Sequence, residues 1–194
     1  MIKSEFIRAL ERRSVIAAVR GAQDVRRAAD SPASAVFLLG GSILTLEEMT
    51  RALHGAGKSV FVHLDLCEGL GKDAAAVEWC ARFVKPDGFI STRSQPLRRA
   101  GELGLMTIQR IFLVDSGSLT GGMRHLSANP PDFIEVMPGL VTRAIRRLSD
   151  SVGQPVIAGG MLEAAEDVEA ALCAGALAAS TSSENLWART AWQR

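Results

Sequence analysis

The residues best suited to binding a phosphate group lie in two short segments near the end of the chain. Gly159 and Gly160 follow one apolar run, and Ser180, Thr181 and Ser182 end the next. Glycines allow backbone N–H groups to approach a ligand closely, and hydroxyls hydrogen-bond to phosphate oxygens. A helix beginning beyond Ser182 would add a partial positive charge. We therefore predict that these residues bind phosphate; the alternative is that they are only turns and caps.

A second polar group follows the apolar run near residue 60. His63 and Asp65 are two residues apart, so their side chains share one face of a strand. Three interpretations remain open: the pair binds a divalent metal, lines a ligand site, or is a structural pair. Glu68 and Lys72 follow in a glycine-containing turn, where Lys72 either reaches a phosphate or stays in solvent. The Walker spacing of a P-loop is absent.

Polar residues also end the remaining apolar runs, and they are candidates for lining a ligand site. Arg110 and Glu135 either form an ion pair, or Glu135 accepts a hydrogen bond from a polyol hydroxyl. No Ser-His-Asp or Cys-His set can be assembled, so no catalytic residue is assigned. The predicted ligand-lining residues are Arg20, His63, Asp65, Glu68, Lys72, Ser91, Thr92, Gln109, Arg110 and Glu135.

Short apolar runs position these residues along the whole chain. Each run is too short for a helix and nearly continuous, which is typical of buried parallel strands. The predicted strands are Val15–Val19, Ala35–Leu39, Ser59–Leu64, Gly88–Ser91, Met106–Leu113, Phe133–Met137, Pro155–Ala158 and Ala176–Ala179.

Helical patterns lie between the strands. They include Ala22–Asp30, a helix starting at Thr45, and the segments Asp73–Phe83, Leu97–Leu103 and Ala164–Ala174. Alternating strands and helices predict an α/β protein, either an open doubly wound sheet or a (β/α)8 barrel. Eight runs that nearly all end in a polar residue or glycine favour a compact TIM-like (β/α)8 barrel, with residues 1–194 as a single domain.

Composition and charge limit the possible partners. The chain has 194 residues, 47% hydrophobic and 22% charged, with 22 basic and 21 acidic residues for a net charge of +1. A uniformly basic surface is therefore excluded, but a local patch is not. Arginine pairs expected on helices could contact an RNA backbone or simply face solvent. The RNA-binding candidates are Arg98, Arg99, Arg146 and Arg147.

The redox and targeting signals point to a cytoplasmic protein without a membrane segment. Its three cysteines, Cys67, Cys80 and Cys173, form no close pair, so neither a disulfide framework nor a cysteine-based zinc site is expected. The N-terminus lacks the apolar core of a signal peptide. The apolar runs are far shorter than the roughly 20 residues of a membrane span.

Several of these segments, taken together and in order, closely resemble the glycerol-3-phosphate-responsive antiterminator family of bacteria. The likeness runs from Val15 to Trp187. It is carried by residues 58–70 (KSVFVHLDLCEGL), 84–92 (VKPDGFIST), 107–110 (TIQR), 132–139 (DFIEVMPG), 157–160 (IAGG) and 180–187 (STSSENLW).

The resemblance implies a regulator without catalytic activity or cofactor. Its fold would be a TIM-like barrel, its effector glycerol 3-phosphate and its partner the leader mRNA of the glycerol operon, with a homo-oligomer possible. Two positions depart from the family pattern, Gly41 in the Gly-Gly-Ser segment and Arg20 where lysine is commoner. Both bear on effector specificity.

The competing prediction is a metal-dependent phosphosugar epimerase or isomerase on the same barrel. His63, Asp65 and Glu68 resemble the metal-ligand strand of ribulose-phosphate epimerases. Such an enzyme needs a second histidine on another strand and an aspartate near the seventh-strand glycines. The two other histidines, His54 and His125, fall in expected helices, and the seventh strand offers only Ala158, Gly159 and Gly160. We therefore predict that no metal is required.

Overall fold

The computed structural model of the protein, which describes residues 2–128 and 130–192, is a closed barrel of parallel strands in sequence order. The first strand closes the ring by pairing with the last, with Ile16 opposite Ser180. This confirms the predicted α/β fold of TIM type. The strands are β1 (Val15–Val19), β2 (Ala35–Leu38), β3 (Ser59–His63), β4 (Gly88–Ser91), β5 (Met106–Phe112), β6 (Phe133–Met137), β7 (Val156–Gly159) and β8 (Ala178–Thr181).

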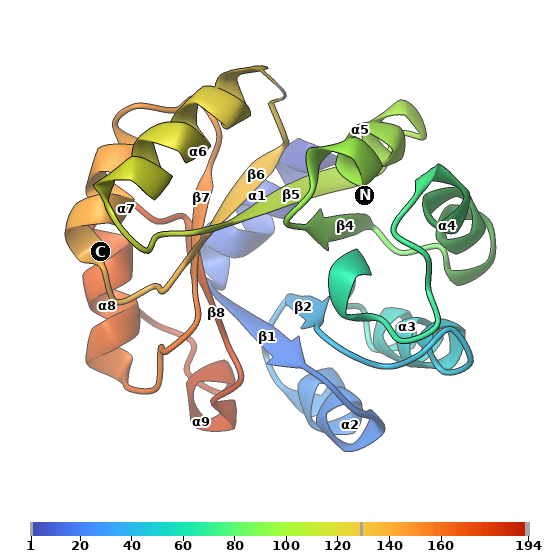
Figure 1. Cartoon of the computed structure of the whole chain (residues 1–194). Coiled ribbons are helices and arrows are strands. Elements are labelled where there is room, and N and C mark those ends of the chain that lie inside the picture. Colours follow the sequence, from blue (N-terminus) through green and yellow to red (C-terminus); the bar gives the residue numbers. More distant parts are fainter. Residues whose placement is uncertain (1, 129, 193–194) are drawn as a thin grey trace.

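Helices surround the strands (Figure 1). None in the described ranges is long and apolar enough to cross a membrane. The α-helices are α1 (Lys3–Arg12), α2 (Ala22–Asp30), α3 (Leu46–Gly55), α4 (Ala74–Trp79), α5 (Ser94–Glu102), α6 (Ser116–Ala128), α7 (Thr142–Ser149), α8 (Ala165–Cys173) and α9 (Glu184–Trp187). A 3-10 turn, η1 (Leu64–Leu66), follows β3, and a π-helical turn, η2 (Cys80–Val84), continues α4.

Most predicted strand boundaries agree with the structure to within one residue, but β8 begins two residues later than expected. Gly175 adopts a left-handed φ of 101°, and the backbone N–H of Ala176 still bonds to the carbonyl of Ala171 in α8. These residues therefore finish the helix cap before the strand starts. The expected helix Asp73–Phe83 is shared between α4 and η2.

The barrel interior is filled by large side chains that alternate along the strands. Phe37, Phe61 and Phe133 are fully buried there. Helix α1 closes the amino-terminal end of the barrel by inserting Phe6, whose ring centroid lies 4.7 Å from that of Phe61 and 5.2 Å from that of Phe133. The amino-terminal half of the barrel is thus apolar and closed. The open face of the barrel lies at the carboxyl ends of the strands.

Candidate functional site

The carboxyl ends of the strands surround a cavity of about 660 Å³. It brings together residues from β1, β5, β6 and β8 and from the segments that follow β1, β2, β7 and β8. Seven of the predicted site residues line it, namely Arg20, Arg110, Glu135, Gly160, Ser180, Thr181 and Ser182. The other lining residues are Ala18, Leu39, Met137, Met161, Leu162, Glu163 and Ser183.

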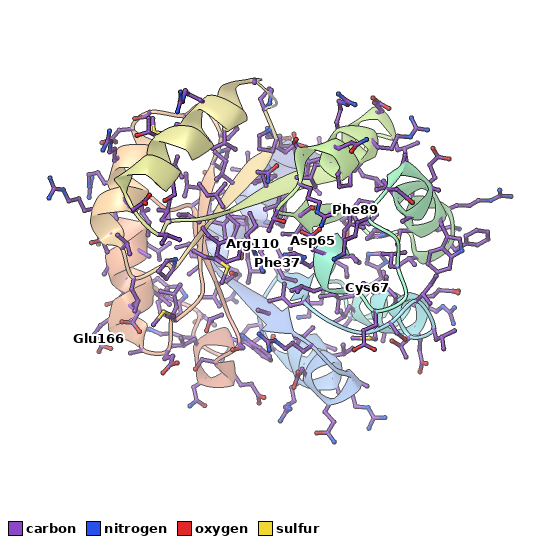
Figure 2. All side chains as sticks on the ribbon, viewed as in Figure 1. Phe37, Asp65, Cys67, Phe89, Arg110 and Glu166 are labelled. Atoms are coloured by element: carbon purple, nitrogen blue, oxygen red, sulfur yellow. The ribbon has the colours of Figure 1, made fainter. Side chains whose placement is uncertain are left out.

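A buried ion pair forms the floor of this cavity. The Nε atom of Arg110 donates to Oε2 of Glu135 at 2.6 Å, and the Ser180 hydroxyl donates to Oε1 of the same carboxylate at 2.7 Å. Figure 2 places Arg110 near the centre of the barrel. The two terminal nitrogens of Arg110 make no hydrogen bond within the described ranges, so they remain available to a ligand.

Gly159 permits this arrangement without lining the cavity. A Cβ atom at this position would lie 2.6 Å from Oε1 of Glu135 and 2.7 Å from Oγ of Ser180. Both distances are shorter than real Cβ contacts, so any larger residue would displace the bonded carboxylate. Gly159, predicted to bind phosphate, therefore has a clear packing role beneath the cavity.

The hydroxyl groups of the predicted phosphate-binding residues differ in whether they are already hydrogen-bonded within the protein. Thr181 Oγ1 donates to the carbonyl of Leu162 at 2.6 Å and accepts from the Ser183 N–H at 3.0 Å, and Ser180 is bonded to Glu135. Ser182 is exposed, and its hydroxyl has no partner in the part of the chain that the structure describes. Helix α9 has only four residues, so its dipole adds less positive charge than the sequence suggested.

Arg20 and Glu163 carry the exposed charges of the cavity wall. Arg20 directly follows β1, and its guanidinium pairs with no described carboxylate. Its close approach to β2 depends on Gly40, since a Cβ there would lie 2.8 Å from the Arg20 carbonyl oxygen. Because Glu135 neutralises Arg110, Arg20 is the uncompensated cation at this site, with Glu163 as an opposing charge at the rim.

Asp65 braces the ends of β3 and β4 and lies apart from the cavity lining. Its carboxylate accepts from the Thr92 backbone N–H at 2.7 Å, from the Thr92 hydroxyl at 3.0 Å, and from the Ser91 hydroxyl at 3.1 and 3.2 Å. Burial raises the pKa of Asp65, but these hydrogen bonds outweigh burial and the pKa is lowered overall. The three residues therefore form a structural brace that holds the neighbouring strand ends together.

His63 is a buried imidazole to which no described residue offers a hydrogen bond. The side chain is 2% exposed, neither ring nitrogen is bonded within the described ranges, and Nδ1 lies 4.0 Å from Oδ2 of Asp65. Burial, together with the positive charge of Arg110, lowers the pKa of His63 to about 4. The ring is therefore neutral at neutral pH, and it lies next to Arg110 without lining the cavity itself.

Three further predicted lining residues do not reach the cavity. Gln109 points to the opposite face of β5 from Arg110, and its buried amide donates to the carbonyls of Ser91 and Arg110. The reason is the alternation of side chains along a strand, which allows only one of two adjacent residues to face the mouth. Glu68 and Lys72 are exposed in the connection from β3 to α4 and do not line the cavity.

Met161 lines the cavity although nothing in the sequence singled it out. Its φ of 62° is left-handed, and the preceding Gly160 also has a positive φ of 75°. Such a conformation costs a non-glycine residue of order 1 kcal/mol or more and is concentrated at functional loops. The Gly-Gly dipeptide before it was the available signal, since it marks a loop with unusual backbone geometry.

The predicted RNA-binding pairs have different surroundings. Arg99 is held by Glu78 and Glu102 at 2.8 Å each, while Arg98 is exposed. Arg146 and Arg147 are exposed on α7, and neither pairs with a carboxylate in the described part of the chain.

The fold and the cavity together define the class of the protein. It is a (β/α)8 barrel whose cavity opens at the carboxyl ends of the strands, the face where TIM barrels hold their ligands. The chain belongs to the glycerol-3-phosphate responsive antiterminator family, whose model matches residues 15–187.

Relatives at about one-third identity extend this assignment. The chain is 33% identical over 178 residues to an uncharacterized Escherichia coli protein, YgcP, covering 92% of this chain and 93% of that protein. It is similar in structure to the glycerol uptake operon antiterminator regulatory protein of Listeria monocytogenes, with a TM-score of 0.86, 30% identity and coverage of 90% and 94% of the two chains. A glycerol uptake operon antiterminator-related protein of Thermotoga maritima matches with a TM-score of 0.80, 30% identity and coverage of 91% and 98%.

Proposed function

We propose that the protein senses glycerol 3-phosphate in the mouth cavity and, in that state, binds the leader mRNA of the glycerol uptake operon and prevents termination. Support comes from membership of the antiterminator family and from the similarity to the Listeria and Thermotoga antiterminator proteins. The observation that carries the ligand proposal is Arg110. Glu135 holds one edge of its guanidinium, and the terminal nitrogens remain available to an anion in the cavity.

In this proposal the phosphate binds toward the β7–β8 side of the mouth. Arg20 provides the net positive charge, and the terminal nitrogens of Arg110 provide hydrogen-bond donors. Ser182 provides a free hydroxyl, and the loop at Gly160 provides backbone N–H groups. Arginine suits this role because its planar group can bind two phosphate oxygens at once. The glycerol hydroxyls then point down toward Ser180 and Glu135, on the floor of the cavity.

The side chains at the mouth favour binding over catalysis. The four lysines, Lys3, Lys58, Lys72 and Lys85, all lie outside the cavity lining, so no Schiff base can form there. An epimerase-type metal site would use His63 and Asp65, but Asp65 is engaged by Ser91 and Thr92. No set of three metal-ligating side chains occurs within the described ranges. We therefore propose a cytoplasmic regulator that acts without catalysis, metal or cofactor.

Thermal unfolding with and without ligand tests this proposal. Ligand at 100 times its dissociation constant adds about 2.7 kcal/mol of stability, so glycerol 3-phosphate should raise the melting temperature. Glycerol at equal concentration should not, and a chelator should leave the effect unchanged. Equal shifts from glycerol and glycerol 3-phosphate would show that phosphate is not recognised.

An arginine variant localises the same effect to the mouth. Arg20→Gln should weaken glycerol 3-phosphate binding by about 10- to 100-fold, because a hydrogen bond to a charged group contributes about 1.5–3 kcal/mol. Arg26→Gln is the matched control, since Arg26 is an exposed arginine outside the cavity. Equal effects of the two substitutions would place the ligand elsewhere.

A further inference from the structure

One part of the surface carries several arginines and few acidic residues, although the chain as a whole has a net charge of only +1. Between residues 116 and 149 the acidic residues are Asp132 and Glu135. Asp132 lies 3.2 Å from the amino group of Lys3, and Glu135 is buried against Arg110. The outer surface of α6 and α7 therefore carries arginines that no acidic residue of this segment neutralises.

Three of these arginines share one side of α7. Arg143, Arg146 and Arg147 have the i, i+3, i+4 spacing that aligns side chains on a helix, while Ile145 and Leu148 on the other side are buried. The three arginines line a shallow hollow of about 650 Å³ between α7 and α8. We call these residues the α7 arginine face.

The guanidinium groups of this face are largely unoccupied. Arg146 donates to the carbonyl of Cys173, whereas Arg143 and Arg147 have no side-chain hydrogen bond or ion pair in the described part of the chain. Among the described residues, Asp150 is the one acidic residue lining the hollow. Helix α6, which packs beside α7 in Figure 1, adds the exposed Arg124.

Several arginines elsewhere on the surface are already paired, and unpaired ones such as Arg8 and Arg12 line no such hollow. Arg27 is bound by Asp24 at 2.8 Å and Glu184 at 3.0 Å, Arg51 by Glu47 at 2.5 Å, and Arg99 by Glu78 and Glu102. An arginine that is already paired must give up its partner before it can bind a phosphate. The α7 arginine face meets a polyanion without that competition.

The face also adjoins the mouth cavity along the chain. Met137, at the end of β6, lines the cavity, and α7 begins at Thr142. Between them the Gly139 N–H bonds to the carbonyl of Gly159 at 2.6 Å and to that of Gly160 at 3.1 Å. The loop that leads into α7 is thus hydrogen-bonded to the loop where we place the phosphate.

We propose that the α7 arginine face is the surface that contacts the phosphate backbone of the leader mRNA, with Arg143 and Arg147 as its principal contacts. This inference rests on the proposed function, which supplies RNA as the polyanion. We favour this face over the other predicted pair, because Arg99 is already held by two carboxylates and only Arg98 of that pair is without an ion-pair partner among the described residues. The effector and the RNA would then meet the same β6–α7 connection from opposite ends.

RNA-binding titrations at several salt concentrations, with glycerol 3-phosphate present, test the assignment. The probe is a fluorescent transcript of the glycerol operon leader, measured by anisotropy on the full chain. Each phosphate of a single strand that an arginine neutralises adds about 0.7 to the steepness of the salt dependence. Arg143→Gln/Arg147→Gln should therefore make the slope shallower by about 1.4 and weaken binding. Arg8→Gln/Arg12→Gln is the control, with equal spacing and charge change on α1 at the closed end of the barrel.

The outcomes separate this inference from the proposed function. A fall in affinity in the α7 variant, with wild-type behaviour in the α1 variant, supports the face. Equal behaviour of the two variants overturns it. If the wild type binds no leader RNA at any salt concentration, the proposed function itself fails. The melting shift with glycerol 3-phosphate confirms that each variant is folded, and Arg143→Lys/Arg147→Lys should restore most of the binding if the glutamine pair does not fold.

Discussion

Arg110 and Glu135 form an ion pair inside the barrel, with Nε and Oε2 separated by 2.6 Å and the two side chains 6% and 0% exposed. The two residues lie opposite one another on the adjacent strands β5 and β6. Each charge compensates the other, because a single unpaired charge in the barrel interior would carry a large desolvation cost. The pair stands at the level where the apolar filling of the barrel gives way to the open mouth. It therefore turns the guanidinium of Arg110 into a fixed, oriented donor at the floor of the cavity.

Removal of one partner of this pair should be far more damaging than replacement of both. Glu135→Ala leaves the buried charge of Arg110 unpaired and should lower the free energy of unfolding by about 3–5 kcal/mol. Arg110→Met/Glu135→Leu removes both charges and should cost less than the single variant. Urea unfolding of the single and double variants gives the comparison, and a double variant as unstable as Glu135→Ala would contradict it.

Gly159→Ala should disturb the cavity floor. The added Cβ would lie within 2.7 Å of both Glu135 and Ser180, and overpacking of this kind costs about 1–3 kcal/mol. Because Glu135 orients Arg110, glycerol 3-phosphate affinity should fall as well. Gly153→Ala is the control, since a Cβ there meets no atom within 4 Å. Calorimetric titration of both variants with glycerol 3-phosphate measures the difference in affinity. Unchanged affinity in Gly159→Ala would show that Glu135 does not contribute to ligand binding.

His63 should make the protein less stable as the pH falls. Its pKa is lowered from 6.5 to about 4 in the folded chain, so between these values the unfolded chain binds the additional proton. Stability from this residue is fully present above pH 6.5 and is lost progressively toward pH 4, by about 2–3 kcal/mol at pH 4.5.

The measurement is urea unfolding at pH 7 and pH 4.5 for the wild type and His63→Leu. The variant cannot titrate at this position, so its stability should change less between the two pH values. His54 and Asp87 are common to both proteins and cancel in the difference. Identical pH dependence of the two proteins would show that the pKa of His63 is not lowered in the folded state.

Helix α1 should be essential for a stable barrel, because Phe6 is fully buried against Phe61 and Phe133. Phe6→Ala should cost about 3–5 kcal/mol, the usual cost of truncating a core phenylalanine. Phe83→Ala is the control, since Phe83 is 49% exposed and its truncation should matter much less. Denaturant unfolding compares the two, and similar stabilities would mean that the barrel does not depend on the closing helix.

The barrel itself could be predicted from the sequence, because buried parallel strands are nearly continuous apolar runs and Ile157, Phe133 and their neighbours lie in such runs. Helix α1 could not be anticipated as the closing element. Its buried Phe6 and Leu10 are four residues apart, as in any amphipathic helix, and only the closed ring of strands shows that they enter the barrel.

The site could be predicted in part. Polar residues at strand ends correctly indicated Arg20, Arg110, Glu135, Gly160 and Ser182 as neighbours, because parallel strands end at one face. Sequence position alone does not give side-chain direction, so Gln109 was grouped with the adjacent Arg110. Sequence position also does not show which polar groups are already hydrogen-bonded to one another. The carboxylate of Asp65, for example, is bonded to Thr92. Those contacts depend on the register between strands that are distant in sequence.

A crystal structure of the protein with glycerol 3-phosphate tests the central claim most directly. The phosphate should lie in the mouth cavity, within hydrogen-bond distance of the Arg20 guanidinium, the terminal nitrogens of Arg110 and the Ser182 hydroxyl. The Arg110–Glu135 pair should be unchanged beneath it. A ligand bound outside the cavity, or one whose phosphate contacts neither arginine, would contradict the account.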